Sequence, residues 1–169
     1  MSPILYSAPK ENYKEHIGLC LEYFELVFPV YKSRLMKVLS WNDEVSLKEA
    51  MQKMVLYHDL GKLTQKWQES IIKGYKRRPA HSHLGACYLW NTLPEGLREP
   101  TSFAVLIHHT DKGLLSDIIE RPAEVAILDG IIDLDGNVKW HEGLDLLDNK
   151  LFPQEAKDLS VEDLKEMAI

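Results

Sequence analysis

The stretch from Met54 to Lys62 constrains this chain more than any other. It reads Met-Val-Leu-Tyr-His-Asp-Leu-Gly-Lys, an apolar helical run that ends in a histidine and an aspartate. Consecutive helical residues point about 100° apart, so His58 and Asp59 can reach one site only from a helix terminus or a distorted turn. We expect Gly61 to supply that terminus.

This pair has two possible explanations. An imidazole beside a carboxylate suits first-row divalent metal ions, and the two oxygens of an aspartate can bridge two of them. Lys62 would then be free to hold an anion near the metals. Alternatively, His58 is a half-buried helix residue and Asp59 a local cap. The rest of the chain has to decide between these explanations.

Length and composition indicate a single domain over residues 1–169. The chain has 169 residues, of which 45% are hydrophobic, enough to fill a sizeable core. Cys20 and Cys87 form no C-x-x-C motif, so neither a zinc ribbon nor a disulfide framework is indicated, and a reducing cytoplasm fits. No apolar run approaches the roughly 18 residues that span a bilayer. We expect a cytoplasmic protein that does not associate with membranes.

The charges are unevenly distributed. The net charge is −6. Residues 1–110 carry 14 Lys and Arg against 11 Asp and Glu, whereas residues 111–169 carry 6 against 15. The acidic C-terminal third is either a solvated face or a surface offered to a basic partner protein.

Helical periodicity predicts an all-α fold, and no strand pattern of any length is present. We expect a first helix over residues 11–28 that Pro29 closes, and a short helix and loop over 31–42. The later helices are expected at Leu47 to about His58 with Ser46 as N-cap, Gln65–Ile72 with Thr64 as N-cap, 82–91, a short apolar helix that ends at Ile107, Ala123–Asp133, 140–147 and 153–167.

Several of these helices carry further histidines. His16 lies on the same strip as Cys20 and, taken singly, can be either a hydrogen-bonded core residue or a metal ligand. His81 stands at the entry of the helix over 82–91 and His83 in its first turn, and spacing alone does not choose between them. Gly85-Ala86 are small, so another helix can approach that helix closely.

Two further positions complete the candidate ligands. His108 and His109 end an otherwise apolar helix, which packing alone explains poorly. Asp129 interrupts the apolar face of the helix predicted over 123–133, where a carboxylate is costly unless it is paired or bound to a cation.

A basic segment follows the His-Asp pair. Between residues 62 and 78 the chain has six Lys and Arg against one acid, with Trp67 and Tyr75 interleaved. Such a mixture suits a single-stranded nucleic acid, whose phosphates need cations and whose bases stack; it also suits a solvated surface. The residues expected to contact substrate are Lys62, Lys66, Lys76, Arg77 and Arg78.

Taken together, the ligand types exceed what one tetrahedral ion needs. They suit two ions about 3.5–4 Å apart with Asp59 between them, an arrangement typical of phosphoryl chemistry. Asp59 and Lys62 are the candidate catalytic residues, the lysine because it could neutralise charge on the phosphorus oxygens. The candidate metal ligands are His16, His58, Asp59, His81, His108, His109 and Asp129.

These motifs resemble the HD-superfamily nuclease of type I CRISPR interference. The resemblance spans about residues 11–135, with 138–169 as a helical extension. It rests on His58-Asp59-Leu60-Gly61-Lys62 and its continuation to Gln68, a helical His16 upstream, His81-x-x-x-Gly85-Ala86, His108-His109 and a later helical Asp129.

The resemblance implies a compact helical HD domain that cuts single-stranded DNA with a divalent metal pair, such as Mn, Ni, Co or Mg. It implies that His16, His58, Asp59 and Asp129 hold one ion, and Asp59, His81, His108 and His109 the other. It favours His81 over His83, because the family histidine lies four residues before a Gly or Ser, and Gly85 is that residue here.

The resemblance also implies partners, which are a CRISPR helicase subunit and the crRNA-guided complex. No G-x-x-x-x-G-K-[ST] motif is present, so the motor is expected on a separate chain. Two alternatives remain: an HD phosphohydrolase that acts on nucleotides or cyclic nucleotides, and an assembly subunit that is inactive without its partner.

Overall fold

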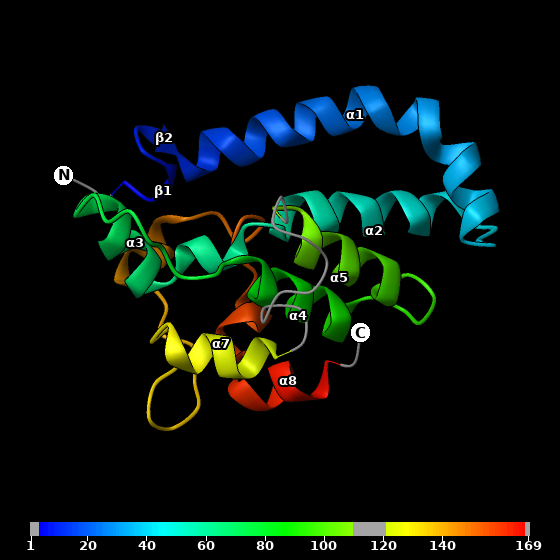
Figure 1. Cartoon of the computed structure of the whole chain (residues 1–169). Helices are drawn as coiled ribbons and strands as arrows, with labels where there is room; N and C mark the ends of the chain where they lie inside the picture. Colours follow the sequence, from blue (N-terminus) through cyan, green and yellow to red (C-terminus); the bar gives the residue numbers. More distant parts are fainter. Residues whose placement is uncertain (1–3, 110–120, 168–169) are drawn as a thin grey trace.

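The computed structural model describes residues 4–109 and 121–167, and these are mostly helical (Figure 1). This agrees with the predicted all-α class, except that one short antiparallel hairpin is present. In chain order the elements are β1 (Tyr6–Ala8), β2 (Glu11–Asn12), α1 (Tyr13–Val38), α2 (Glu44–Tyr57), the 3₁₀ helix η1 (Leu60–Leu63), α3 (Gln65–Ile72), α4 (Ser82–Thr92), α5 (Arg98–Ile107), α7 (Pro122–Leu128), the 3₁₀ helices η2 (Glu142–Leu146) and η3 (Gln154–Asp158), and α8 (Val161–Glu166).

Helix α4 lies at the centre of the molecule. Every residue from Ser82 to Leu89 is buried, and α4 packs against α2, η1, α5 and α8. A Cβ at Gly85 would lie only 2.1 Å from the carbonyl oxygen of Tyr57, at the end of α2. The predicted close approach at Gly85 is therefore confirmed, and it joins α4 to the segment that carries His58.

Gly61 has a different role from the one predicted. It lies inside η1 without a positive φ, so left-handed backbone at this residue does not end α2. A Cβ at Gly61 would lie 2.3 Å from the carbonyl oxygen of His81. Gly61 thus lets η1 pass directly against the backbone at the start of α4.

Helix α1 is longer than predicted, because Pro29 does not close it. Pro29 lies inside the helix, which runs on to Val38. An internal proline costs a helix about 3 kcal/mol or more. Beyond Pro29, Leu35 and Met36 pack against the core, and Lys32 forms an ion pair with Glu44 of α2. These contacts offset the cost, and Figure 1 shows α1 changing direction in its second half.

Helix α2 begins three residues before the predicted Leu47. Its N-cap is Asp43, whose side chain accepts a hydrogen bond from the backbone N–H of Val45. Ser46, predicted as the cap, instead accepts a hydrogen bond from the indole N–H of Trp41. An aspartate is as good an N-cap as a serine, so the first available residue takes the position.

The part after residue 120 departs most from the predictions. Helix α7 ends at Leu128 rather than at Asp133, since Gly130 follows with a φ of +72°. Leu128, which lies in the segment predicted as a helix with an apolar face, is 85% exposed. The two predicted amphipathic helices are replaced by η2, η3 and the single α-helix α8. In the part of the chain that the structure describes, no helix combines the length and apolarity needed to cross a membrane.

Candidate metal centre

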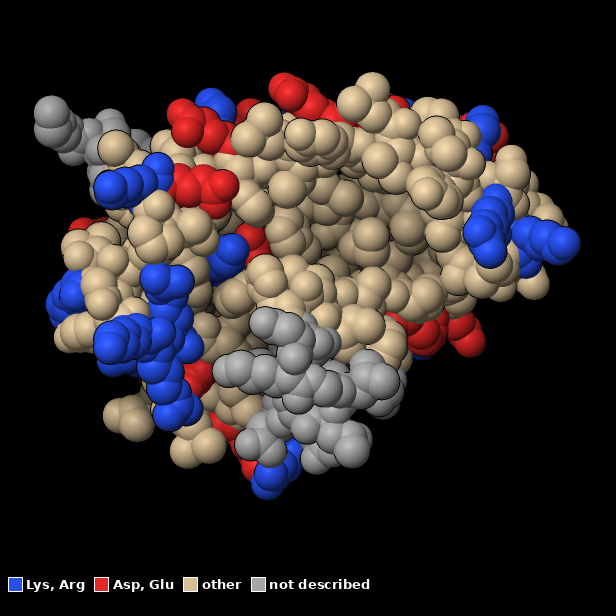
Figure 2. Space-filling model, turned by 45° about the horizontal axis from the view of Figure 1, so that its top comes forward, with Lys and Arg blue, Asp and Glu red and all other residues tan. Residues whose placement is uncertain are grey.

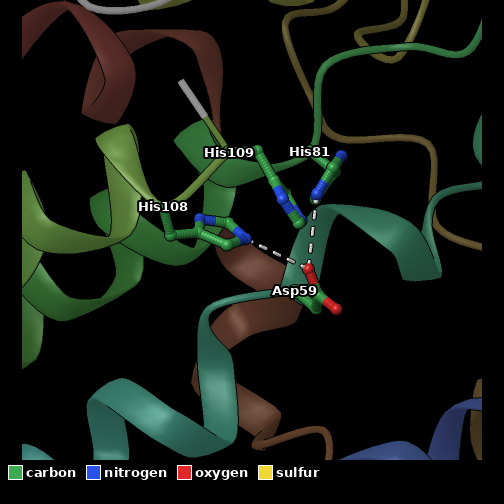
Figure 3. A group of neighbouring side chains, drawn as sticks. All are labelled: Asp59, His81, His108 and His109. Carbon is green, nitrogen blue, oxygen red and sulfur yellow. Dashed lines mark ion pairs between the residues drawn. The ribbon is translucent and has the colours of Figure 1, made fainter. Parts of the chain in front are cut away.

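The carboxylate of Asp59 lies at the centre of the site, where α2 gives way to η1. Its side chain is buried, and its two oxygens face different partners. Oδ2 lies 3.2 Å from Nε2 of His16 and 3.3 Å from Nε2 of His58. Oδ1 lies 3.3 Å from Nε2 of His81 and 3.4 Å from Nε2 of His108 (Figure 3). One carboxylate therefore joins two sets of imidazoles.

Helix ends fix the orientation of two of these imidazoles. Nδ1 of His58 lies 2.7 Å from the carbonyl oxygen of Val55, and Nδ1 of His108 lies 2.5 Å from that of Val105. A carbonyl only accepts hydrogen bonds, so each Nδ1 carries the proton. The lone pair of each neutral ring is then on Nε2, the atom that faces Asp59. This is how a metal-binding histidine is normally held by its second nitrogen.

Three buried atoms of the site have no hydrogen-bond partner among the described residues. They are Oδ1 of Asp59 and Nε2 of His81 and of His108. An unpartnered buried polar atom costs about 1–3 kcal/mol. Metal–ligand bonds of about 2.1 Å at angles of 90–110° would place ligand atoms about 3.0–3.4 Å apart, which matches the observed separations. The donor set therefore fits a divalent cation.

The protonation of the site also suits a cation. Burial by itself raises the pKa of Asp59, but the nearby imidazoles of His108, His58 and His81 outweigh it and leave this pKa well below its usual range. Burial lowers the pKa of His81, and burial together with His108 and His81 lowers the pKa of His109 to about 4. At neutral pH, Asp59 is therefore an anion and these two imidazoles are neutral, the forms that bind metals.

The candidate ligands form two groups among the described residues. In the first, Asp59, His81, His108 and His109 each offer an atom within 4.8 Å of the others (Figure 3). The second group consists of His16, Cys20 and His58 by the same measure. The structure thus brings six of the seven predicted metal ligands together around Asp59.

Asp129 belongs to neither group of the described residues. Because α7 ends at Leu128, Asp129 is the C-cap of the helix. Its Oδ2 accepts a hydrogen bond of 2.7 Å from the backbone N–H of Ala80. The expected ligand role is therefore not what this structure shows. Asp129 instead fixes the residue that precedes His81, and so helps to position that imidazole.

Lys62 also differs from the expectation that its ammonium is free to hold an anion. It is buried, and its Nζ lies 2.6 Å from Oδ2 of Asp59. The ammonium also lies 5.7 Å from the ring centroid of Trp67. The positive charge of Lys62 thus compensates the charge of the buried carboxylate at Oδ2, the oxygen that faces His16 and His58.

His83 is placed away from the centre. It is fully buried, and neither ring nitrogen has a hydrogen-bond partner among the described residues. Burial lowers its pKa to about 3. It is absent from both ligand groups, whereas His81 belongs to the first, so the geometry agrees with the preference for His81.

Two residues beside the metal ligands were not predicted from the sequence. Cys20 lies one helical turn after His16, with Sγ 3.7 Å from its Nε2. Oε2 of Glu11 lies 3.4 Å from Nδ1 of His16 and accepts a hydrogen bond from Ser7. The i, i+4 spacing of His16 and Cys20 was visible in the sequence, whereas Glu11 depends on the hairpin.

Basic residues lie to one side of the centre. Lys66, Lys76, Arg77 and Arg78 are exposed, and the guanidinium of Arg78 lies 6.0 Å from the ring centroid of Trp67. Figure 2 shows Lys and Arg side chains gathered on the side of the molecule where α3 lies in Figure 1.

An apolar groove lies between α1, α2 and α5 and reaches the same centre. It has a volume of about 660 Å³, and its lining includes Tyr23, Phe24, Phe28 and Tyr31 of α1. The ligands His58 and His108 line it as well. Figure 2 shows the corresponding hollow of uncharged side chains.

Comparisons with protein-family models, with curated proteins and with solved structures found no match for this chain.

Proposed function

We propose that this protein is a metal-dependent phosphodiesterase of the HD type that cuts single-stranded DNA. The observation that carries the proposal is the carboxylate of Asp59, whose two oxygens face two separate groups of imidazoles. An aspartate so placed can bridge two ions. In the fuller form of the proposal, the chain works with a separate helicase and a crRNA-guided complex in CRISPR interference.

The chain's own residues supply the binding part of the chemistry. His81, His108 and His109 would hold one ion with Oδ1 of Asp59, and His16 and His58 the other with Oδ2. Two such ions supply a nucleophile from water near neutral pH and a clamp on the phosphoryl oxygens. Lys62 forms an ion pair with Asp59 and holds this carboxylate in place.

The surroundings of the centre support a single-stranded substrate. Arg77 and Arg78 are exposed cations that phosphates could contact, and the aromatic lining of the groove offers Tyr23 and Tyr31 for base stacking. Both features lie next to the metal ligands: Arg78 contacts Trp67, whose ring lies 6.3 Å from that of His81, and the groove reaches His58.

A nuclease assay tests the proposal. The full chain is incubated with circular single-stranded DNA in the presence of Mn²⁺, Co²⁺, Ni²⁺ or Mg²⁺. We expect the wild-type protein to cut the circle, and Asp59→Asn to abolish cutting. Asp145→Asn is the matched control, since Asp145 is exposed and pairs only with Lys157 among the described residues. Far-ultraviolet circular dichroism checks the fold.

A second variant keeps the test decisive if Asp59→Asn fails to fold because Lys62 is left buried without its partner. His109→Ala removes an exposed ligand and should preserve the fold while it reduces cutting. Full activity of both His109→Ala and a folded Asp59→Asn would overturn the proposal.

The groove also favours a second candidate, hydrolysis of nucleotides or cyclic nucleotides. Its volume of about 660 Å³ falls in the range of small-molecule sites, about 300–1,000 Å³. The same metal-loaded protein is therefore incubated with mononucleotides and cyclic nucleotides. Turnover of these compounds with the DNA circle intact would replace the nuclease proposal with this one.

A further inference from the structure

One side of α1 faces the metal centre with two ligand-type side chains. His16 and Cys20 are four residues apart, and residues at this spacing lie one above the other on the same helix face. This brings Sγ of Cys20 to 3.7 Å from Nε2 of His16. Cys20 also lines the groove, as do His58 and His108.

The separations around this group resemble the edges of a coordination tetrahedron. Bonds of about 2.0–2.1 Å to nitrogen and oxygen and about 2.3 Å to sulfur imply edges of about 3.4 Å for N···N and N···O and about 3.6 Å for S···N. His16 and His58 lie 3.5 Å apart through Nε2, and they lie 3.2 and 3.3 Å from Oδ2 of Asp59. The Cys20–His16 edge is 3.7 Å.

Cys20 is less completely placed than the other three ligands. Its Sγ lies within 4.8 Å of a ring nitrogen of His58, against about 3.6 Å for a closed tetrahedron, and Asp59 is not part of the group that Cys20 forms with His16 and His58. Cys20 would therefore have to move toward His58 and Asp59 to complete the set, and it lines the groove.

Both imidazoles of the group direct Nε2 toward its centre. Nδ1 of His58 donates to the carbonyl of Val55, and Nδ1 of His16 lies 3.4 Å from the carboxylate of Glu11. A carbonyl or carboxylate behind a histidine is the usual arrangement around a bound metal. Two oriented imidazoles and a buried carboxylate therefore converge beside the thiol.

We propose that Cys20 is the fourth protein ligand of the ion held by His16, His58 and Asp59, in the place that Asp129 was expected to take. On binding, the thiol releases its proton to solvent and coordinates as the thiolate. A set of two imidazoles, one carboxylate and one thiolate selects Zn²⁺, Co²⁺ or Ni²⁺ over Mg²⁺, because thiolates prefer softer ions. This inference rests on the metal binding that the proposed function requires, and it is independent of the substrate.

Cobalt titration of the full chain tests the assignment. Co²⁺ bound to a thiolate gives a charge-transfer absorption in the near ultraviolet, whereas Co²⁺ bound only to nitrogen and oxygen does not. We expect this band in the wild type, its loss in Cys20→Ser, and its retention in Cys87→Ser. Cys87 is the matched control, since it is a buried cysteine on α4 outside both ligand groups. Cys20→Ser should also weaken binding of one Co²⁺ at least about tenfold.

Alkylation gives a readout that needs no variant. Iodoacetamide labelling of Cys20, located by mass spectrometry, should be slowed by Zn²⁺ and left unchanged by the same concentration of Mg²⁺. Co²⁺ binding without the band and without protection of Cys20 would overturn the assignment and leave the proposed function standing. If the protein binds no divalent ion at all, both the assignment and the proposed function fail.

Discussion

The contact between Gly85 and the end of α2 leads to a prediction in which one substitution has opposite effects at two helical glycines. A Cβ at Gly85 would lie 2.1 Å from the carbonyl oxygen of Tyr57, so Gly85→Ala requires a movement of about 1 Å to reach normal contact. The obstacle is backbone, and α4 is buried along most of its length. At Gly18, in α1, no atom of the described residues lies within 4 Å of the added methyl group.

The magnitudes follow from these surroundings. Replacing a helical glycine by alanine gains about 0.8–1.0 kcal/mol of helix propensity. Overpacking costs about 1–3 kcal/mol, and the upper end applies at Gly85 because neither backbone can yield easily. We expect Gly85→Ala to lower the free energy of unfolding by about 2 kcal/mol and Gly18→Ala to raise it by up to about 1 kcal/mol. For a domain of 169 residues, each kcal/mol shifts Tm by about 2–4 °C.

Thermal unfolding in EDTA measures both variants against the wild type, and Co²⁺ titration follows. Gly85→Ala should also weaken metal binding, because the displaced end of α2 carries His58. Gly18→Ala should leave the affinity unchanged. If Gly85→Ala proved as stable as the wild type and bound metal equally well, the tight contact between α4 and the end of α2 at Gly85 would be refuted.

Three further predictions concern charge and protonation. Arg77→Ala combined with Arg78→Ala should reduce the salt dependence of single-stranded DNA binding by about 1.4 in the log–log slope, with Lys157→Ala and Lys165→Ala as the charge-matched control; an unchanged slope would remove these arginines from the interface. Glu11→Gln should weaken Co²⁺ binding about 10–100-fold in calorimetric titration, because the carboxylate of Glu11 orients the imidazole of His16. The exposed Glu15→Gln is the control. Equal Co²⁺ affinity in the two variants would show that Glu11 does not support His16. Burial lowers the pKa of His83 from 6.5 to about 3, so the unfolded chain binds more protons between these pH values and stability is lost as pH falls through that window. His83→Leu should therefore lose less stability than the wild type in acid denaturation of the metal-free protein. An unaltered pH profile in this variant would contradict a buried neutral imidazole at His83.

The sequence allowed the helices nearest the site to be predicted, because their signals are local. Helix α3 begins at Gln65 after Thr64, as expected, and α4 begins at Ser82. The two helices that end in His58 and His108 also end where the sequence indicated. At these positions apolar periodicity, small residues and polar termini all agree.

The predictions failed where tertiary contacts or turn chemistry decided the structure. Pro29 was expected to close α1, but packing of Leu35 and Met36 on the core continues the helix beyond it. At the other end of the chain, apolar periodicity was followed to Asp133 although Gly130 provides a stop signal. That error placed Asp129 inside a helix, whereas it is the C-cap of α7 and accepts a hydrogen bond from the backbone of Ala80.

The two helix ends at the centre explain why adjacent ligand-type residues suit this site. The C-termini of α2 and α5 both point to it, and a helix C-terminus carries a partial negative charge that stabilises a nearby cation by about 0.3–1 kcal/mol. The last helical carbonyls also lack the N–H donor four residues on that a continuing helix would supply. Those of Val55 and Val105 accept a hydrogen bond from Nδ1 of His58 and of His108, which directs each Nε2 inward. A histidine at a helix end is thus oriented by the helix itself, and the next residue can face the same ion because the helix has stopped.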